Sequence, residues 1–113
     1  LYQKRKLRAG DLSFGQQKLL ELAMALMNEP EMLLLDEPTA GINPTLINGI
    51  IDRLIKVNQE FGITLLVIEH NMRVIMQLAE SIFSLAHGKM LANGTPDEIK
   101  NDKRVIDAYL GAQ

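Results

Sequence analysis

Two adjacent carboxylates, Asp36 and Glu37, come directly after a short apolar run in the segment MLLLDEP, residues 32–38. Such a run is typical of a buried parallel strand, which would deliver both side chains to the carboxyl edge of a sheet, where ligands of open α/β sheets bind. One carboxylate could hold a hydrated Mg²⁺ there, while its neighbour orients or deprotonates a water molecule. The alternative is an ordinary strand end that continues into an acidic turn.

A histidine, His70, follows a second apolar run, ITLLVI at residues 63–68. If the two runs are neighbouring parallel strands, His70 lies level with Asp36 and Glu37, and its imidazole could donate a hydrogen bond to a phosphate oxygen. The alternative is a lone surface histidine in a strand-to-helix turn. The other histidine, His87, lies in a predicted hairpin turn, and we assign it no function.

The segment LSFGQ, residues 12–16, begins a predicted helix. Ser13 and Gln16 have the spacing of a capping box, which is a purely structural interpretation. The functional alternative is a phosphate held at the helix start by free N–H groups, by the Ser13 hydroxyl and by the positive end of the helix dipole. Gly15 would then let the backbone approach the phosphate closely. Taken by itself, the segment leaves both interpretations open.

Composition and charge exclude several classes of function. Twelve basic and fourteen acidic side chains give a formal net charge of -2, which offers no electrostatic basis for binding nucleic acid. We therefore interpret the basic cluster at residues 4–8 as a solvated surface segment. The chain has no cysteine, which excludes disulfides and thiolate metal sites. The phosphate-loop sequence G-x-x-x-x-G-K-[ST] does not occur within the 113 residues.

Apolar periodicity predicts the helices that position these residues. Pro30 ends a first helix, whose apolar face consists of Leu19, Leu22, Ala23 and Leu26. Asn43 and Pro44 begin a second helix and Gly62 caps its end. The apolar stripe of this second helix consists of Ile47, Ile50, Ile51, Leu54 and Ile55.

The C-terminal third is predicted to contain a helix, a hairpin and a final helical region. Asn71 caps the helix, which carries Val74, Ile75 and Leu78, and SIFSLA and KMLANG form a hairpin around His87-Gly88. The capping box TPDE, residues 95–98, opens helical structure that ends near Leu110. Because helices and apolar strands alternate along the chain, we predict an α/β fold with a parallel sheet.

Together these motifs resemble the ATPase subunits of ABC transporters. LSFGQ is similar to their signature motif, MLLLDE to the Walker B strand, AGIN (residues 40–43) to the D-loop, and His70 to the switch histidine. The segments IEHNM and AYLG look most like the subunits that drive branched-chain amino acid import. The resemblance implies the C-terminal part of a P-loop NTPase domain of the ABC type: parallel strands with flanking helices, then a small hairpin and helices.

The resemblance also implies a mechanism, in which two ATPase domains close head to tail on two ATP molecules. Ser13 and Gly15 would hold the γ-phosphate of an ATP bound mainly by the partner, and Gln16 would support that turn. In the chain's own half-site, Asp36 would hold Mg²⁺ through water and Glu37 would be the general base. His70 would contact the γ-phosphate there.

Two residues depart from the family pattern. Phe14 replaces the first glycine of the signature motif, and because Ser13 and Gly15 remain, we expect the nucleotide site to survive. Asn43 replaces the usual aspartate of the D-loop, so that hydrogen-bonding ability is kept and a charge is lost. We count both residues among the expected nucleotide-binding residues.

The implied partners are a second ATPase subunit, identical or different, and transmembrane permease subunits, with a solute-binding protein acting indirectly. No nucleic acid is expected. The implied location is the cytoplasmic face of the cell membrane, reached through the permeases. We expect residues 1–113 to be a single partial domain without the Walker A half, and therefore inactive alone and prone to self-associate through uncovered apolar surface.

Three alternatives to an importer subunit stay open. One is a non-transport ABC ATPase, acting in repair or translation. Another is an ATPase of the lipopolysaccharide-export type, whose C-terminal tails are similar. The last is a non-catalytic α/β interaction module with chance motifs, which three motifs in the correct order disfavour.

Overall fold

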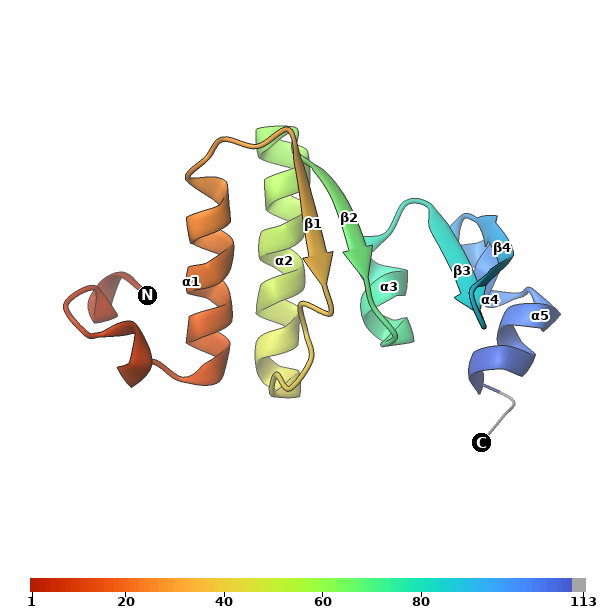
Figure 1. Ribbon diagram of the computed structural model, residues 1–113, viewed down its shortest axis with the longest axis horizontal. Coiled ribbons are helices and arrows are strands. Elements are labelled where there is room, and N and C mark those ends of the chain that lie inside the picture. The colour runs from red at the N-terminus through yellow and green to blue at the C-terminus, as the bar shows by residue number, and fades with distance from the viewer. Residues whose placement is uncertain (111–113) are drawn as a thin grey trace. The chain divides into compact units, whose positions relative to one another are not determined.

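The computed structural model describes residues 1–110, which form two compact units (Figure 1). The first unit, Leu1–His70, contains two 3-10 turns, two long helices and two strands. In chain order they are η1 (Tyr2–Lys4), η2 (Ala9–Asp11), α1 (Phe14–Leu26), β1 (Met32–Asp36), α2 (Pro44–Phe61) and β2 (Thr64–Ile68). The predicted α/β class is confirmed, and the N-terminal segment with the basic cluster contains short 3-10 turns.

The two strands of the first unit pair in parallel, as predicted, with α2 as the connection between them. Leu33 lies beside Leu65, and Asp36 lies beside Ile68. Both strands therefore end at the same edge, which places the segments that follow them next to each other. Figure 1 shows the two arrows pointing the same way, toward the end of the unit where α1 and α2 begin.

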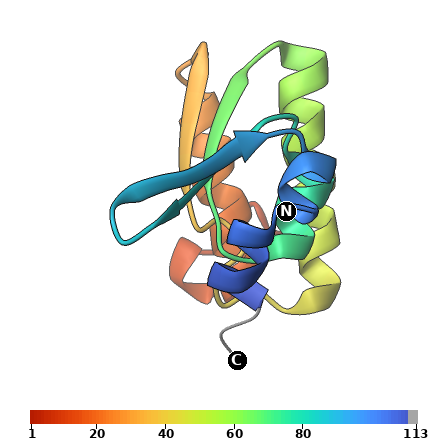
Figure 2. The ribbon, with the colours of Figure 1, turned by 90° about the vertical axis from the view of Figure 1, so that its right-hand side faces the viewer.

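One face of this sheet packs against the helices. Leu33, Val57 and Ile63 are buried together, and residues of α1 and both strands pack around them: Leu22, Ala25, Leu26, Leu35 and Leu65. The view in Figure 2 separates the two strands from α2, which lies along one side of them. Ala23, which we predicted on the apolar face of α1, is exposed, and Ala25 takes that place.

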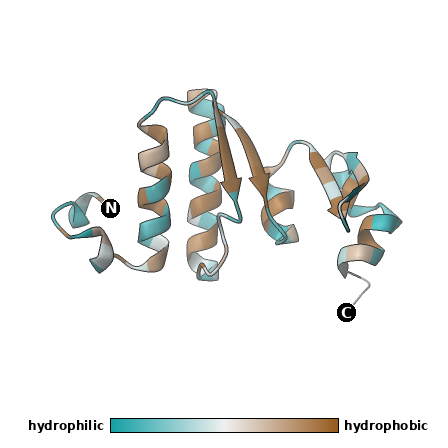
Figure 3. Ribbon diagram, viewed as in Figure 1, coloured by the Kyte–Doolittle hydropathy of each residue, from teal (hydrophilic) through white to brown (hydrophobic). Residues whose placement is uncertain are grey.

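The opposite face of the sheet is exposed, which corrects the prediction that the two apolar runs form buried strands. Its side chains are Met32, Leu34, Leu66 and Ile68, and Leu34 is 71% exposed. Figure 3 shows both strands as apolar along their length. Both strands are apolar on their two faces, as is usual for parallel strands, which are normally covered on both sides. In this unit the packed helices cover only one face.

The ends of α2 follow the sequence signals closely. The side chain of Asn43 accepts a hydrogen bond from the Thr45 backbone, Pro44 is the first helical residue, and Gly62 ends the helix with a φ of 66°. A left-handed residue at this position suits glycine because it has no Cβ. The buried stripe consists of Ile47, Ile50, Ile51, Leu54 and Val57, so that Val57 replaces the predicted Ile55.

The second unit begins at Asn71. It contains α3 (Met72–Leu78), β3 (Ile82–Ala86), β4 (Lys89–Gly94), α4 (Pro96–Lys100), α5 (Lys103–Val105) and a π-helical turn, η3 (Ile106–Leu110). The predicted hairpin is confirmed, and His87 and Gly88 have φ values of 51° and 75°, as a type I′ turn requires. The capping box of Thr95 and Glu98 is also confirmed.

The final helical region is interrupted, which the sequence pattern did not predict. α4 ends at Lys100, and Asp102 caps a new helix by accepting a hydrogen bond from the Arg104 backbone. A small core holds this unit together, made of Ile82, Ala92, Ile99 and Val105 with Ile75, Met76 and Ala79 around them. The Tyr109 hydroxyl donates a hydrogen bond to the Leu85 carbonyl, which ties the π-helical turn to the hairpin.

Candidate functional site

The carboxylate of Glu37 and the imidazole of His70 are in direct contact. Glu37 Oε1 lies 2.8 Å from His70 Nδ1, although the two residues are 33 positions apart in the chain. Because an ionised carboxylate can only accept, Nδ1 carries the proton in this bond and Nε2 is directed elsewhere. The side chains are 47% and 70% exposed, so a ligand can reach both. His70 was predicted to lie level with Asp36 and Glu37: the placement beside Glu37 is confirmed, whereas Asp36 is wrong as a neighbour because it pairs with Ile68.

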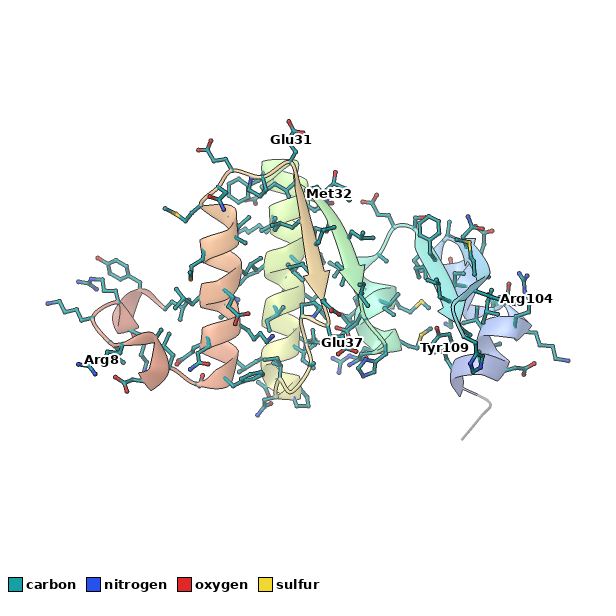
Figure 4. The ribbon with its side chains drawn as sticks, viewed as in Figure 1. Arg8, Glu31, Met32, Glu37, Arg104 and Tyr109 are labelled. Carbon is teal, nitrogen blue, oxygen red and sulfur yellow. The ribbon has the colours of Figure 1, made fainter. Side chains whose placement is uncertain are left out.

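The backbone at Glu37 turns sharply where β1 ends. Glu37 has a φ of 48°, a left-handed conformation that costs a residue with a side chain about 1–2 kcal/mol. Its N–H donates a 2.7 Å hydrogen bond to the carbonyl of Ile68, and its carbonyl accepts one from Ala40. Strained backbone of this kind clusters at functional sites. Figure 4 shows Glu37 at the end of β1, opposite Met32 at its start.

Asp36 is the last residue of β1 and is exposed. Strand alternation places its side chain on the same face as Leu34, away from the helices. Among residues 1–110, no group of three His, Asp or Glu side chains could hold a metal ion by itself. Mg²⁺ is commonly bound by one or two carboxylates together with phosphate oxygens and water, so a single exposed Asp36 fits that partial role.

The start of α1 shows the capping box in full. Ser13 Oγ accepts a 3.3 Å hydrogen bond from the Gln16 N–H, and Gln16 Oε1 accepts a 2.9 Å bond from the Ser13 N–H. The structural interpretation of LSFGQ is therefore confirmed. The Ser13 hydroxyl acts as acceptor in this bond, so its proton can still be donated to another group. Capping and phosphate binding are thus compatible at this helix start.

Two glycines lie at close contacts that the start of α1 makes with α2 and with the segment after β1. A Cβ on Gly15 would lie 2.7 Å from Leu46 Cδ1, which gives this buried glycine a packing role that sequence reasoning missed. Gly41 has a φ of 70°, and a Cβ there would lie 3.2 Å from Phe14 Cε1. Phe14, the departure from the family signature, therefore rests against the segment that resembles the D-loop. Asn43 in that segment uses its side chain to cap α2.

A buried hydrogen bond beside the Glu37–His70 pair was also missed. The Thr39 hydroxyl donates to Glu69 Oε2 at 2.7 Å, and Thr39 is 5% exposed. The Glu69 side chain is 1% exposed even though its neighbour His70 is open to solvent. One signal was available, because continuing the alternation of Ile63, Leu65 and Val67 places Glu69 on the helix-covered face.

A hollow of about 200 Å³ lies in the second unit and is not part of this cluster. Its lining is apolar apart from two basic residues: Met72, Arg73, Met76, Ile99, Lys100, Val105 and Ile106. None of the predicted site residues contributes to it, so we place the candidate site at the strand ends of the first unit. Within the described part of the chain, no helix is both long and apolar enough to cross a membrane.

Two protein-family models match the chain. Residues 1–40 match a model described as ABC transporter, and residues 89–113 match one described as branched-chain amino acid ATP-binding cassette transporter. The first match contains Ser13, Asp36 and Glu37, whereas Asn43 and His70 lie outside both.

Curated relatives carry related descriptions. The chain is 42% identical, over 91% of its length, to BraF, a high-affinity branched-chain amino acid transport ATP-binding protein of Pseudomonas aeruginosa. It is 39% identical, over 92% of its length, to LivG of Escherichia coli K12, which has the same description. These alignments cover 40% and 41% of the relatives, so the chain spans about two fifths of their length.

Solved ABC transporter cassettes share the fold. The ADP conformation of the ATP-binding cassette MJ1267 matches with a TM-score of 0.83 and 37% identity, over 93% of this chain and 42% of that one. The dimeric bacterial cassette MJ0796 matches with a TM-score of 0.69 and 31% identity, over 79% of this chain and 38% of that one. By sequence and by fold, the chain belongs to the ATP-binding cassettes of ABC transporters.

Proposed function

We propose that the protein containing this chain hydrolyses ATP and uses the energy to drive the import of branched-chain amino acids. The contact between Glu37 and His70 at the joined ends of two parallel strands carries this proposal. It puts a general base and a proton-bearing imidazole together at the edge where ligands of α/β sheets bind. The descriptions of BraF and LivG support the choice of solute.

In the proposed reaction, Glu37 takes a proton from a water molecule whose oxygen attacks the γ-phosphorus. The bond to the oxygen that bridges the β- and γ-phosphates breaks, and ADP and phosphate leave. His70 donates Nδ1–H to Glu37 and, when Nε2 also carries a proton, donates that second N–H to a γ-phosphate oxygen. Phosphoryl transfer depends mainly on positioning and on charge stabilisation, so both residues act by being held in place.

Asp36 would hold Mg²⁺, which neutralises charge on the phosphate oxygens when it is bound. The exposed carboxylate at the end of β1 supports this assignment. The phosphate-loop sequence does not occur in these 113 residues. We therefore assign the phosphate cradle of this half-site to residues outside this chain.

Ser13 and Gly15 would serve a second ATP, held mainly by a partner subunit. The Ser13 hydroxyl can donate to a phosphate oxygen while it caps α1, and Gln16 keeps it in place through the reciprocal bond. Phe14 and Asn43 would border this site. The dimeric cassette MJ0796 supports a partner of the same kind.

The further partners we propose are permease subunits that span the membrane and, through them, a solute-binding protein. The ATPase subunit would then lie at the cytoplasmic face of the membrane, attached through the permeases. The descriptions of the curated relatives as transport ATP-binding proteins support these assignments.

The test is ATP hydrolysis by the full-length protein that contains this sequence, with the variant Glu37→Gln. Losing a general base is expected to lower kcat about 100-fold or more, with ATP binding retained. Glu60→Gln is the matched control, because it makes the same chemical change at an exposed residue of α2. Full activity in Glu37→Gln, or equal loss in both variants, would contradict the proposal. ATP hydrolysis by the 113 residues alone would contradict the external phosphate cradle.

A further inference from the structure

A second glutamate, Glu69, lies between the end of β2 and His70 and is directed into the unit. Its side chain is 1% exposed. Burying a carboxylate is costly unless hydrogen bonds compensate for the water it loses. An acidic residue at a surface turn could point outward without that cost, so its burial indicates a specific task.

The hydrogen bonds of Glu69 join two segments of the candidate site. Oε2 accepts the Thr39 hydroxyl at 2.7 Å, and Oε1 accepts the backbone N–H of His70 at 3.2 Å. Oε1 also lies 3.9 Å from His70 Nδ1. One buried carboxylate therefore contacts both the segment that follows Glu37 and the residue that Glu37 binds.

The Thr39 segment is itself tightly folded. The Thr39 carbonyl accepts a hydrogen bond from the Ile42 N–H at 3.1 Å, and the Glu37 carbonyl accepts one from the Ala40 N–H, also at 3.1 Å. Residues 37–42 thus form a compact turn that leads to the cap of α2 at Asn43. Holding Thr39 fixes this turn, and the turn carries Glu37.

We propose that Glu69 is a positioning residue for hydrolysis: its buried carboxylate links Thr39 to His70 and thereby holds the Glu37 and His70 side chains at hydrogen-bonding distance. This positioning role rests on the proposed function, since positioning affects kinetics only if Glu37 and His70 act on ATP. Glu69 itself does not touch the nucleotide. Its expected signature is a change in kcat without a matching change in the KM for ATP.

The variants Thr39→Val and Thr39→Ser separate the hydrogen bond from packing. Valine keeps the buried volume and loses the hydroxyl, whereas serine keeps the hydroxyl and loses a methyl group. In the full-length protein we expect Thr39→Val to lower kcat about tenfold with KM within about twofold, and Thr39→Ser to stay within about twofold of the wild type. If the role of Thr39 were packing alone, Thr39→Ser would be the more impaired variant.

Glu69→Gln provides a second route to the same link, with Glu60→Gln as the matched exposed control. Because Thr39 and Glu69 act through one bond, the double variant Thr39→Val/Glu69→Gln should be no slower than the slower single variant. Multiplied effects, or wild-type kcat in both single variants, would overturn the proposal. If Thr39→Val does not fold, Glu69→Gln with Thr39→Ser still decides the question.

A spectroscopic readout keeps this test separate from that of the ATPase function. Nitrogen-15 NMR of the histidine side chains reports which ring nitrogen carries the proton. We expect the Nδ1–H form of His70 in the wild type and a mixture of forms in Thr39→Val and Glu69→Gln, with His87 unchanged in all. A wild-type protein without ATPase activity would contradict the proposed function, whereas an unchanged His70 signal in the variants would overturn the role of Glu69.

Discussion

The Glu37–His70 pair and the Ser13–Gln16 helix start are built in opposite ways. The pair joins residues 33 positions apart and depends on the pairing of two strands, on a left-handed residue and on the buried Glu69. The helix start satisfies its own hydrogen bonds within three positions of sequence. A non-local contact can therefore be lost through distant changes, whereas a local cap persists wherever its helix forms.

The largest effect should come from breaking the non-local region at His70. In the full-length protein, His70→Asn should lower kcat about 100-fold, because both the bond to Glu37 and the proposed contact with the γ-phosphate are lost. Steady-state ATP hydrolysis measures this. His87→Asn makes the same change in the hairpin turn, where Asn tolerates the positive φ, and should leave kcat unaltered. Equal effects of the two variants would show that the histidine position is irrelevant.

The local region can be divided into its two tasks by Ser13→Asp. Aspartate is as good an N-cap as serine, so thermal stability should be kept, whereas its negative charge should repel a phosphate and lower hydrolysis about 30-fold. Thermal unfolding and ATP hydrolysis are measured on the same preparation. Ser13→Ala is the counterpart, and loses about 1 kcal/mol of stability with the cap. Unchanged hydrolysis in Ser13→Asp would leave capping as the sole role.

A smaller effect is expected where the two regions meet, at Gly41. Gly41→Ala should lower the free energy of unfolding by about 1–2 kcal/mol, because its φ of 70° disfavours a Cβ that would also press on Phe14. Denaturant unfolding of the full-length protein measures this. Gly62→Ala has a similar φ of 66° with nothing within 4 Å, so it isolates the backbone cost. A larger loss for Gly62→Ala would contradict the Phe14 contact.

The smallest effect concerns a cap that titrates, in contrast to the neutral cap of Ser13. The Arg104 side chain, hydrogen-bonded at 2.7 Å, lowers the pKa of Asp102 below its ordinary value of 3.8. The stabilisation from this carboxylate is therefore complete above about pH 4 and is lost as the pH falls through the lowered pKa. Amide NMR should show the Arg104 N–H shifting below about pH 4 while that of Gln16 stays constant. If the Arg104 and Gln16 amide signals shifted over the same pH range, global unfolding and not the titration of Asp102 would be the cause.

Local signals predicted most of the fold. The caps at Ser13, Asn43 and Thr95 and the turn at His87-Gly88 depend on neighbours in sequence, and each is confirmed. The parallel pairing also followed from the pattern of elements. The exposed face of Leu34 was not predicted, because an apolar run does not reveal how many of its faces are covered within one stretch of chain.

The candidate site was predicted as a list of residues but not as a network. Strand order alone predicted that His70 lies level with Glu37, and the structure confirms this and adds a direct hydrogen bond between them. The left-handed backbone of Glu37, the burial of Glu69 and its bond to Thr39 depend on how two turns pack against each other. Side-chain types and spacing do not encode that packing directly. The roles of all the predicted site residues toward a nucleotide, Glu37 and His70 included, stay predictions.

The register of β1 against β2 determines the distances between the residues of the whole site. Asp36 lies beside Ile68, and a slip of one residue would move the strand ends by about 3.3 Å and turn each side chain to the other face. The 2.8 Å contact between Glu37 and His70 could not survive such a shift. A substitution of one apolar residue that shifts the strand pairing would then abolish the reaction, although no polar residue of the site had been replaced.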